Sequence, residues 1–380
     1  MSKRYLFTET HVLIEYFCLQ TIYWFSSDSL SDRIMSGGIP LPLFILRGLP
    51  QTSSSVTSLC FLTIDSKDYL ICGTDCGQLL LWSLNTFRFQ SVINNSNQSR
   101  IQHLIPFNDQ FLCQHKNGVI DVFDNQFNLK KSYSMSDSTY CKCFLYSDSD
   151  DNSSLINPKI LGLVSKTNNN LIELFDFKTD TSLVSVGRNE KTYGWPFTLH
   201  ILPFDGRDTE NESVLVIIGY ENGFLTVFKV VPNRSQSQFV TELKCFESII
   251  TSMDFNVKQK TGICCSVGDV ITVWTLNITE DKSQISLSLK KDLKLPNGGL
   301  LCCAIRADGR IFACGGTDNR IRLFALKSCK PLAVMDTHSD AVECLIFSNK
   351  LLSKQNQMFL SVGSRDKTIS IWNLYNNCLE

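Results

Sequence analysis

His338 and Asp366, near the carboxyl end of the chain, are the side chains whose types could support catalysis. Such a pair can move protons or activate a serine or cysteine nucleophile. No nucleophile with a motif of its own accompanies them, and the sequence has no Gly-x-Ser-x-Gly, Gly-x-Gly-x-x-Gly or Walker pattern. Their spacing from Trp372 instead fits a repeated structural unit. We therefore predict no enzyme activity and a structural network of His338, Asp366 and Trp372, incomplete because Val362 stands where Ser or Thr is expected.

Cysteine and histidine could together form a metal site. The chain has 16 Cys but no Cys-x-x-Cys pair, and its five His are scattered, so we predict no metal and no cofactor. Free cysteines inside apolar segments behave as small hydrophobic residues, and the lack of any regular disulfide-like spacing indicates a reducing compartment, the cytoplasm or the nucleus. These buried-type cysteines are Cys60, Cys113, Cys264, Cys302, Cys314 and Cys344.

A strand–turn–strand unit that ends in Trp or Phe recurs roughly every 45 residues. That period is typical of a four-stranded propeller blade, which buries its faces only by stacking against neighbouring blades. No Pro/Gly/Ser linker separates the units. We therefore predict an all-β, seven-bladed WD-repeat β-propeller that forms one domain over residues 43–375. The aromatic residues that mark the blades are Trp82, Phe123, Phe175, Phe228, Trp274, Phe324 and Trp372.

Turn residues and chain ends suggest how the ring is built. Asn117-Gly118 and Asn222-Gly223 lie between β-rich runs and predict two-residue turns with positive φ at both central positions. The short tail after Trp372 cannot supply the outermost strand of a seventh blade. The segment Pro42–Leu46 has the character of Pro331–Met335, the outermost-strand segment of the preceding blade. We therefore predict that residues 43–47 complete the last blade and close the ring.

The segments outside the repeats are residues 1–34 and 376–380. Charged residues interrupt the first segment, its longest uncharged run is Tyr16 to Ser27, and no small-residue cleavage site follows, so we predict neither a signal peptide nor a membrane span. The favoured interpretation is a non-native or disordered extension upstream of a true start at Met35. The alternative is an aromatic segment that packs as a helix or docks a partner.

Charge and exposed side chains bear on the choice of partner. A net charge of -1 provides no overall field for phosphate backbones, so a nucleic acid is not expected. Hairpin turns and inter-blade loops should open on one face of the propeller, and we predict that a protein partner binds there, the alternative being solvated turn residues. The candidate partner-binding residues are Arg320, Arg365, Lys367, Trp195, Tyr193 and Glu221. Two acidic loops on the opposite face form a competing surface, with Asp148, Asp150, Asp151, Asp205, Asp208, Glu210 and Glu212.

The last two repeats resemble the guanine nucleotide-binding protein beta-subunit-like protein 1 family, whose fungal counterpart is the ASTRA-associated WD-repeat protein. The similarity covers roughly residues 43–375 and is weak from about 125 to 195. The segments that carry it are Asp318-Asn319-Arg320-Ile321-Arg322, Lys330-Pro331-Leu332-Ala333-Val334, Ser364-Arg365-Asp366-Lys367, Ile371-Trp372-Asn373-Leu374-Tyr375, Phe44-Ile45-Leu46-Arg47-Gly48 and Ile218-Gly219-Tyr220-Glu221-Asn222-Gly223.

This resemblance implies a non-catalytic scaffold or co-chaperone, monomeric outside its complex. Its implied partners are the TTT complex and RuvB-like AAA ATPases, and its implied clients are the phosphatidylinositol-3-kinase-related kinases that they mature. A G-protein β role is disfavoured because no sustained heptad precedes Leu43. Two alternatives remain open: a chromatin-associated scaffold, and a cullin ubiquitin ligase substrate receptor, whose signature survives only as Phe175-Asp176-Phe177-Lys178.

Overall fold

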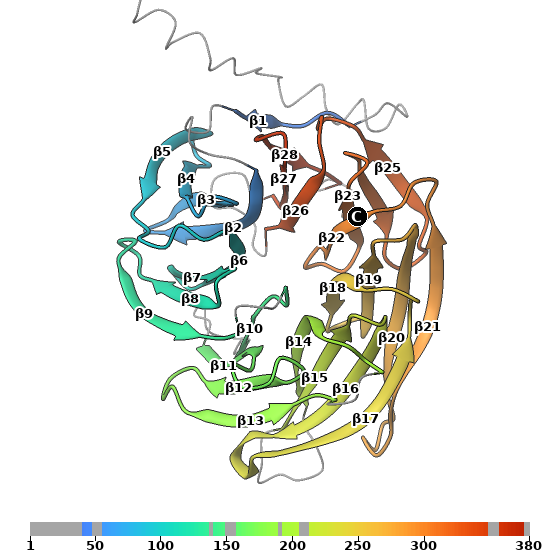
Figure 1. The fold of residues 1–380 in the computed structure, drawn as a ribbon. Helices are drawn as coiled ribbons and strands as arrows, with labels where there is room; N and C mark the ends of the chain where they lie inside the picture. Colours follow the sequence, from blue (N-terminus) through green and yellow to red (C-terminus); the bar gives the residue numbers. More distant parts are fainter. Residues whose placement is uncertain are drawn as a thin grey trace, which may run out of the picture.

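Seven four-stranded antiparallel sheets stand around a common axis (Figure 1). This computed structural model describes residues 40–47, 55–136, 140–148, 157–188, 192–204, 213–348 and 357–375. The prediction of an all-β, seven-bladed propeller is confirmed. The proposed extension 1–34 and tail 376–380 lie outside the described residues. Within these ranges the one helix is the short 3-10 turn η1 (Pro232–Arg234), so no described helix is long and apolar enough to cross a membrane.

The strands of six blades follow one another from the axis outward. Blade 1 contains β2 (Val56–Ile64), β3 (Lys67–Thr74), β4 (Leu79–Ser83) and β5 (Arg88–Ile93). Blade 2 contains β6 (Ile101–Phe107), β7 (Gln110–His115), β8 (Val119–Phe123) and β9 (Leu129–Ser134). Blade 3 contains β10 (Phe144–Asp148), β11 (Asn157–Val164), β12 (Ile172–Asp176) and β13 (Ser182–Val186).

The remaining blades repeat the pattern. Blade 4 contains β14 (Pro196–Phe204), β15 (Ser213–Tyr220), β16 (Phe224–Val231) and β17 (Gln236–Lys244). Blade 5 contains β18 (Ile250–Asn256), β19 (Thr261–Ser266), β20 (Val270–Ile278) and β21 (Ile285–Lys294). Blade 6 contains β22 (Leu300–Ile305), β23 (Ile311–Gly316), β24 (Ile321–Ala325) and β25 (Pro331–Met335). Blade 7 contains β26 (Val342–Phe347), β27 (Phe359–Ser364) and β28 (Ile369–Asn373), with its fourth strand from the other end of the chain.

That fourth strand is β1 (Phe44–Leu46), as predicted from the short carboxyl tail. It runs antiparallel to β28 with Phe44 opposite Ile371, and the Leu43 amide donates to the Ile371 carbonyl at 2.7 Å. The Phe44 ring stacks on Phe87 of blade 1, with centroids 3.5 Å apart. β1 therefore covers the edge of blade 7 and also contacts the first blade, which closes the ring.

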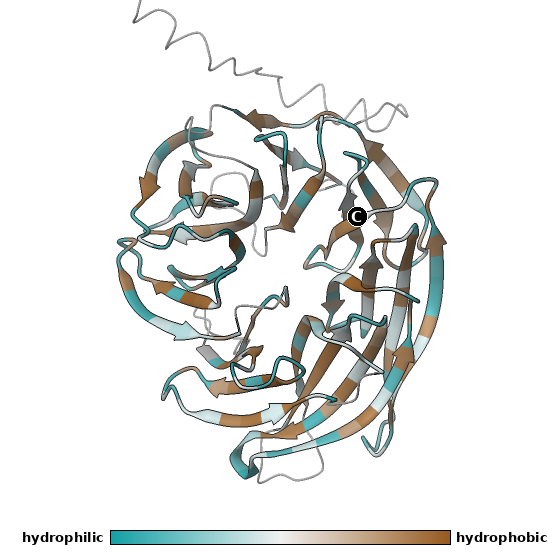
Figure 2. Ribbon diagram, in the orientation of Figure 1, coloured by the Kyte–Doolittle hydropathy of each residue, from teal (hydrophilic) through white to brown (hydrophobic). Residues whose placement is uncertain are grey.

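The core lies between blades. In blade 1 every residue of β4 is buried, whereas most of β5 is exposed, and Figure 2 shows polar and apolar residues alternating along the outermost strands. The seam between blades 7 and 1 is especially close, because a Cβ at Gly363 would lie only 2.2 Å from Val56 Cγ1. A residue without a side chain therefore lets the first strand of blade 1 approach β27.

The hairpin turns differ from the prediction. Gly118 and Gly223 have φ of 79° and 74°, but Asn117 and Asn222 are not in the left-handed region. The Gly118 amide donates to the His115 carbonyl at 3.2 Å, and Val119 resumes the strand. These are three-residue loops, in which a type I turn is followed by one left-handed residue, so the prediction of two positive-φ positions was wrong.

Candidate partner-binding face and its supporting network

The predicted His–Asp–Trp network exists in blade 7 and is complete. His338 Nδ1 lies 3.0 Å from Asp366 Oδ2, and His338 Nε2 lies 2.8 Å from Ser370 Oγ. The Trp372 indole N–H donates to the same Ser370 hydroxyl at 2.8 Å. The expectation of a gap at Val362 was wrong, because the hydroxyl comes from the third strand of the blade, two residues before the tryptophan.

Burial and hydrogen bonding give this network a structural character. Burial alone would raise the pKa of Asp366, but hydrogen bonds from His338 and Thr368 outweigh it and hold the pKa well below its usual range. Ser370 and Trp372 are fully buried, and the His338 side chain has no exposed surface. The network ties the loop that enters blade 7 to the central hairpin. In blades 1 and 5, by contrast, the buried indole nitrogens of Trp82 and Trp274 have no hydrogen-bond partner among the described residues.

A second His–Asp cluster, which the sequence did not reveal, lies in blade 2. His115 Nε2 is 3.2 Å from Asp121 Oδ2 and 3.4 Å from Cys113 Sγ, so one ring nitrogen faces both groups. A catalytic relay would need the base and its orienting carboxylate on opposite ring nitrogens. Burial raises the pKa of the Cys113 thiol far above its usual value. The cluster therefore has the geometry of a packed core rather than of an activated nucleophile.

The described part of the chain has no group of three or more His, Cys, Asp or Glu arranged to hold a metal ion. All six cysteines predicted to act as core residues are buried, and none of the fourteen described cysteines is in a disulfide. Cys265 Sγ and Cys314 Sγ approach to 3.9 Å across the boundary between blades 5 and 6. Burial raises the pKa of most of these thiols, so they pack as apolar groups.

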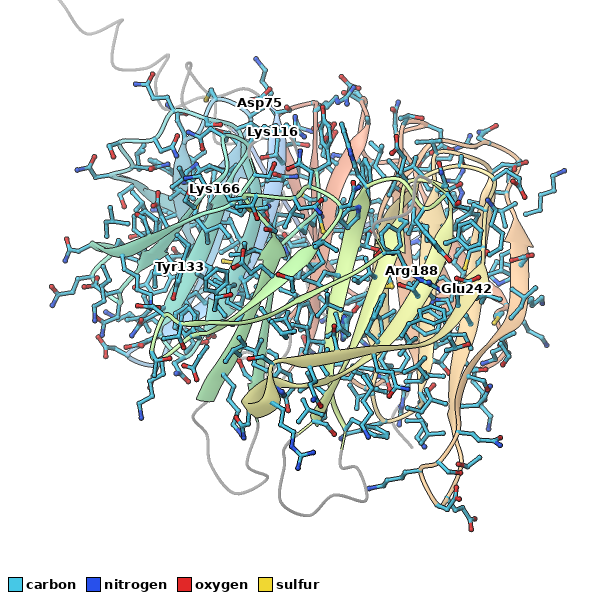
Figure 3. The ribbon with its side chains drawn as sticks, turned by 60° about the horizontal axis from the view of Figure 1, so that its bottom comes forward. Asp75, Lys116, Tyr133, Lys166, Arg188 and Glu242 are labelled. Carbon is cyan, nitrogen blue, oxygen red and sulfur yellow. The ribbon has the colours of Figure 1, made fainter. Side chains whose placement is uncertain are left out.

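The turns between the second and third strands share one end of the propeller with the inter-blade loops, and we call this end the turn face. It comprises the turns 75–78, 116–118, 165–171, 221–223, 267–269, 317–320 and 365–368 and the loop preceding each blade. A repeated hydrogen bond joins turn to loop: the Lys116 amide donates to Arg100 O at 2.8 Å, and the Arg365 amide donates to Ala341 O at 2.9 Å. Figure 3 labels Asp75, Lys116 and Lys166 from three such turns.

Arg320, Arg365 and Lys367 lie on adjacent turns of blades 6 and 7 and are exposed. Asp318 accepts from both terminal nitrogens of the buried Arg322, which leaves the neighbouring Arg320 facing solvent. Arg365 donates to Glu343 Oε1. The Glu343 side chain is only 8% exposed, and its other oxygen accepts from Arg100 at 2.7 Å. One buried carboxylate thus holds two arginines from different blades, so Arg365 is already paired within the chain.

Trp195, Glu221 and Tyr193 lie together in blade 4, apart from the three cations of blades 6 and 7. Trp195 is 44% exposed, and its amide donates to Glu221 Oε2 at 3.2 Å. Tyr193 is only 5% exposed: its hydroxyl donates to Glu242 at 2.6 Å and its ring packs against Tyr220. The expectation that Tyr193 is an exposed anchor was therefore wrong, because its side chain supports the blade.

The structure places the candidate residues on one face but in two separate groups. The acidic loops on the opposite face fall outside the described residues, apart from the backbone of Asp148 at the end of β10. The sequence analysis missed an aromatic pair, the exposed Tyr140 and the half-buried Phe197, whose rings stack with centroids 6.0 Å apart. The signal available was position: Tyr140 lies in the loop before β10 and Phe197 near the start of β14, where a loop reaches the turn face.

The ring of four-stranded blades and the hydrogen-bonded network define a WD-repeat β-propeller. In agreement, residues 288–324 and 329–373 match the family described as "WD domain, G-beta repeat". These ranges run from the outermost strand of blade 5 through blade 6 to β28 of blade 7.

Relatives match most of the chain. Guanine nucleotide-binding protein subunit beta-like protein 1 of Mus musculus is 28% identical, over 88% of this chain and 97% of its own length. ASTRA-associated protein 1 of Schizosaccharomyces pombe is 24% identical, over 89% of this chain and 100% of its own. Serine-threonine kinase receptor-associated protein of Dictyostelium discoideum is 24% identical, over 55% of this chain and 68% of its own. The resemblance to the beta-subunit-like protein 1 family and its ASTRA-associated counterpart is thus confirmed.

Proposed function

We propose that this protein is a non-catalytic WD-repeat scaffold that works within a protein complex. The observation that carries the proposal is the near full-length match to two relatives, one of which is named for its association with ASTRA. The turn face supports it, because exposed Trp and Arg side chains are favoured in protein interfaces. The two His–Asp clusters support it as well, since both are buried in the fold rather than open to a substrate.

We further propose that the partners are the TTT complex and RuvB-like AAA ATPases, and that the clients are phosphatidylinositol-3-kinase-related kinases. This proposal rests on the family resemblance. Its contact surface would be the turns of blades 6 and 7, where Arg320 and Lys367 face solvent and the resemblance is strongest. We expect the protein in the cytoplasm or nucleus and monomeric outside its complex, in keeping with its many buried thiols.

Affinity purification of the full chain from native cells, followed by quantitative mass spectrometry, tests this proposal. Recovery of RuvB-like ATPases and TTT subunits would support it. A cullin adaptor would instead identify a ubiquitin ligase receptor, histones or chromatin remodellers a chromatin scaffold, and a Gγ subunit a G-protein role. Recovery of none of the proposed partners above a mock purification would contradict the co-chaperone function.

Charge-reversal variants locate the surface. Arg320→Glu combined with Lys367→Glu should lower partner recovery at least tenfold and reduce kinase levels, without changing the melting temperature by more than a few degrees. Arg365 is left intact because its reversal would face Glu343 and disturb the fold. Lys327→Glu, an exposed charge on the opposite face of blade 6, is the matched control. Equal recovery from the double variant and this control would exclude blades 6 and 7 as the contact.

A further inference from the structure

We propose that the turn face over blades 2 to 4 binds an acidic peptide segment of a protein partner, with Tyr140 as its aromatic anchor. The inference rests on the proposed function as a partner-binding scaffold and adds a second contact site with its own ligand chemistry. It concerns a different part of the turn face from the blade 6 and 7 cations, and its residues come from three consecutive blades.

The first observation is an exposed but ordered aromatic surface. Tyr140, in the loop that enters blade 3, is 60% exposed. Its ring lies nearly parallel to that of Phe197 in β14, at 5° between planes, and Lys116 Nζ of blade 2 lies 3.1 Å from its centroid. Trp195, 44% exposed, comes two residues before Phe197. Tyr and Trp offer large contact areas at a low cost in conformational entropy, which is why they anchor interfaces.

The second observation is local charge. The loops and turns of blades 2 and 3 on the turn face contribute four cations, and their described residues include no carboxylate. The one carboxylate in their sequence, that of Asp137, lies outside the described residues. Arg100 is paired with Glu343, whereas Lys166 is exposed on its turn. An acidic segment complements this surface, and opposite charge would steer its approach. The four cations are Arg100, Lys116, Lys142 and Lys166.

The third observation is that the surface is held in place before any partner arrives. The buried Gln114 side chain donates to the Cys141 carbonyl and accepts from the Cys143 amide, both at 2.8 Å, so it fixes the segment that follows Tyr140. The Asn97 and Asn117 amides donate to one another at 3.3 and 3.1 Å. A preformed surface loses less entropy on binding, which favours recognition of a short, otherwise unstructured peptide.

An acidic peptide fits better than single-stranded nucleic acid, which also uses aromatic rings and cations. Nucleic-acid grooves carry cations along several nucleotides, whereas blade 5, beyond the aromatic pair, presents Glu247 and Asp269 on the same face. These carboxylates would repel a continuing phosphate backbone. In blade 4 the exposed Glu221 lies beside Trp195, so charge on this face suits a short acidic stretch that lies over blades 2 and 3 and ends before Trp195.

Fluorescence anisotropy with a labelled peptide, a central Phe flanked by Glu residues, tests the site on the full chain. We expect saturable binding that weakens as salt rises, and at least tenfold weaker binding when Gln or Lys replaces Glu in the peptide. Tyr140→Ala and Lys166→Glu should each raise Kd at least tenfold, whereas Tyr140→Phe should stay within about threefold because the ring remains. Lys327→Glu and Arg320→Glu are matched controls that should leave Kd unchanged.

Several outcomes would overturn the inference: no binding of the Glu peptide, equal binding of the Gln or Lys peptide, or an unchanged Kd in both Tyr140→Ala and Lys166→Glu. Tighter binding of an oligothymidylate that displaces the peptide would assign the surface to nucleic acid instead. If the peptide fails but affinity purification recovers the proposed complex, the scaffold function stands without this site. If the peptide binds and no complex is recovered, the site stands and the proposed co-chaperone function falls.

Discussion

Replacing Gly363 with alanine tests how the ring closes. An Ala Cβ there would lie 2.2 Å from Val56 Cγ1 and 2.8 Å from Cys344 Sγ, against the roughly 3.5 to 4.0 Å at which carbon atoms normally touch. The neighbours cannot yield easily, because Val56 is fully buried and begins the innermost strand of blade 1. Overpacking of this kind costs about 1 to 3 kcal/mol, partly offset by about 0.5 to 1 kcal/mol from the lower entropy of the unfolded alanine chain.

Urea unfolding followed by tryptophan fluorescence measures the effect, because Trp82 and Trp372 report on the two blades that meet at this seam. We expect Gly363→Ala to lower the free energy of unfolding by about 1 to 2 kcal/mol. Gly268→Ala is the matched control, since its Cβ would meet only Ser266 Oγ, at 3.1 Å, and should change stability by less than about 0.5 kcal/mol.

A double-mutant cycle separates the clash from other effects of the substitution. Val56→Ala alone should destabilise by about 1 to 3 kcal/mol through lost burial. Combined with Gly363→Ala it should cost less than the sum of the two by at least about 0.5 kcal/mol, because the new methyl occupies the vacated space. Additivity within about 0.3 kcal/mol, or a neutral Gly363→Ala, would refute the packing argument.

Four further substitutions test the aromatic and polar groups inside the blades. Trp372→Ala should destabilise by about 3 to 5 kcal/mol and His338→Ala by about 1 to 3 kcal/mol in denaturant titrations, through lost packing and an unsatisfied network; an unshifted His338→Ala curve would contradict this. Burial raises the pKa of the Asp254 carboxyl to about 6, so the free energy of unfolding should fall as pH rises from about 4 to about 6. In pH-dependent melts, Asp254→Asn should abolish that fall and stabilise the protein by about 1 to 3 kcal/mol at pH 7.5. Arg306 is 2% exposed, donates to the Leu374 carbonyl at 2.7 Å and pairs with Asp308. In urea unfolding, Arg306→Ala should therefore lower the free energy of unfolding by about 2 to 4 kcal/mol. The control, Arg310→Ala at an exposed position, should lower it by less than about 0.5 kcal/mol.

The sequence was sufficient to predict the ring because each blade repeats the same local pattern. Strand, turn and aromatic residue recur with one period, and Pro42–Leu46 has the character of Pro331–Met335, the outermost strand of blade 6. The turn geometry was not predicted correctly, because Asn-Gly suits both a two-residue turn and a three-residue loop with one left-handed residue. Lys367 and Asn319 occupy that left-handed position in blades 7 and 6, which the residue types alone do not indicate.

The candidate site was harder to predict because its properties depend on contacts between distant segments. Glu343 joins Arg365 to Arg100 across blade 1, and nothing local marks either arginine as paired. Two nearby aromatic residues of one loop differ in exposure: Tyr193 packs inward against Tyr220, while Trp195 faces solvent. Both distinctions arise when the blades assemble, so they are not visible in residue type or spacing.

Stability and recognition reside in different parts of this propeller. The sheet faces are buried between blades and the edge of the last blade is covered by β1, so the loops and turns at the two ends are the main parts left to vary without unfolding the chain. On the turn face, the exposed cations of blades 6 and 7 are separated from the Tyr140–Phe197 pair by the turns of blade 5 on one side and of blades 1 and 2 on the other. These two contact surfaces could bind one extended partner at both points or two partners at once. If the partners are separate, a substitution in one surface should leave binding at the other surface unchanged. Affinity purification with the Tyr140→Ala variant and with the Arg320→Glu and Lys367→Glu double variant distinguishes these arrangements. Loss of the same partner from both variants indicates one bivalent partner. Loss of a different protein from each variant indicates two partners.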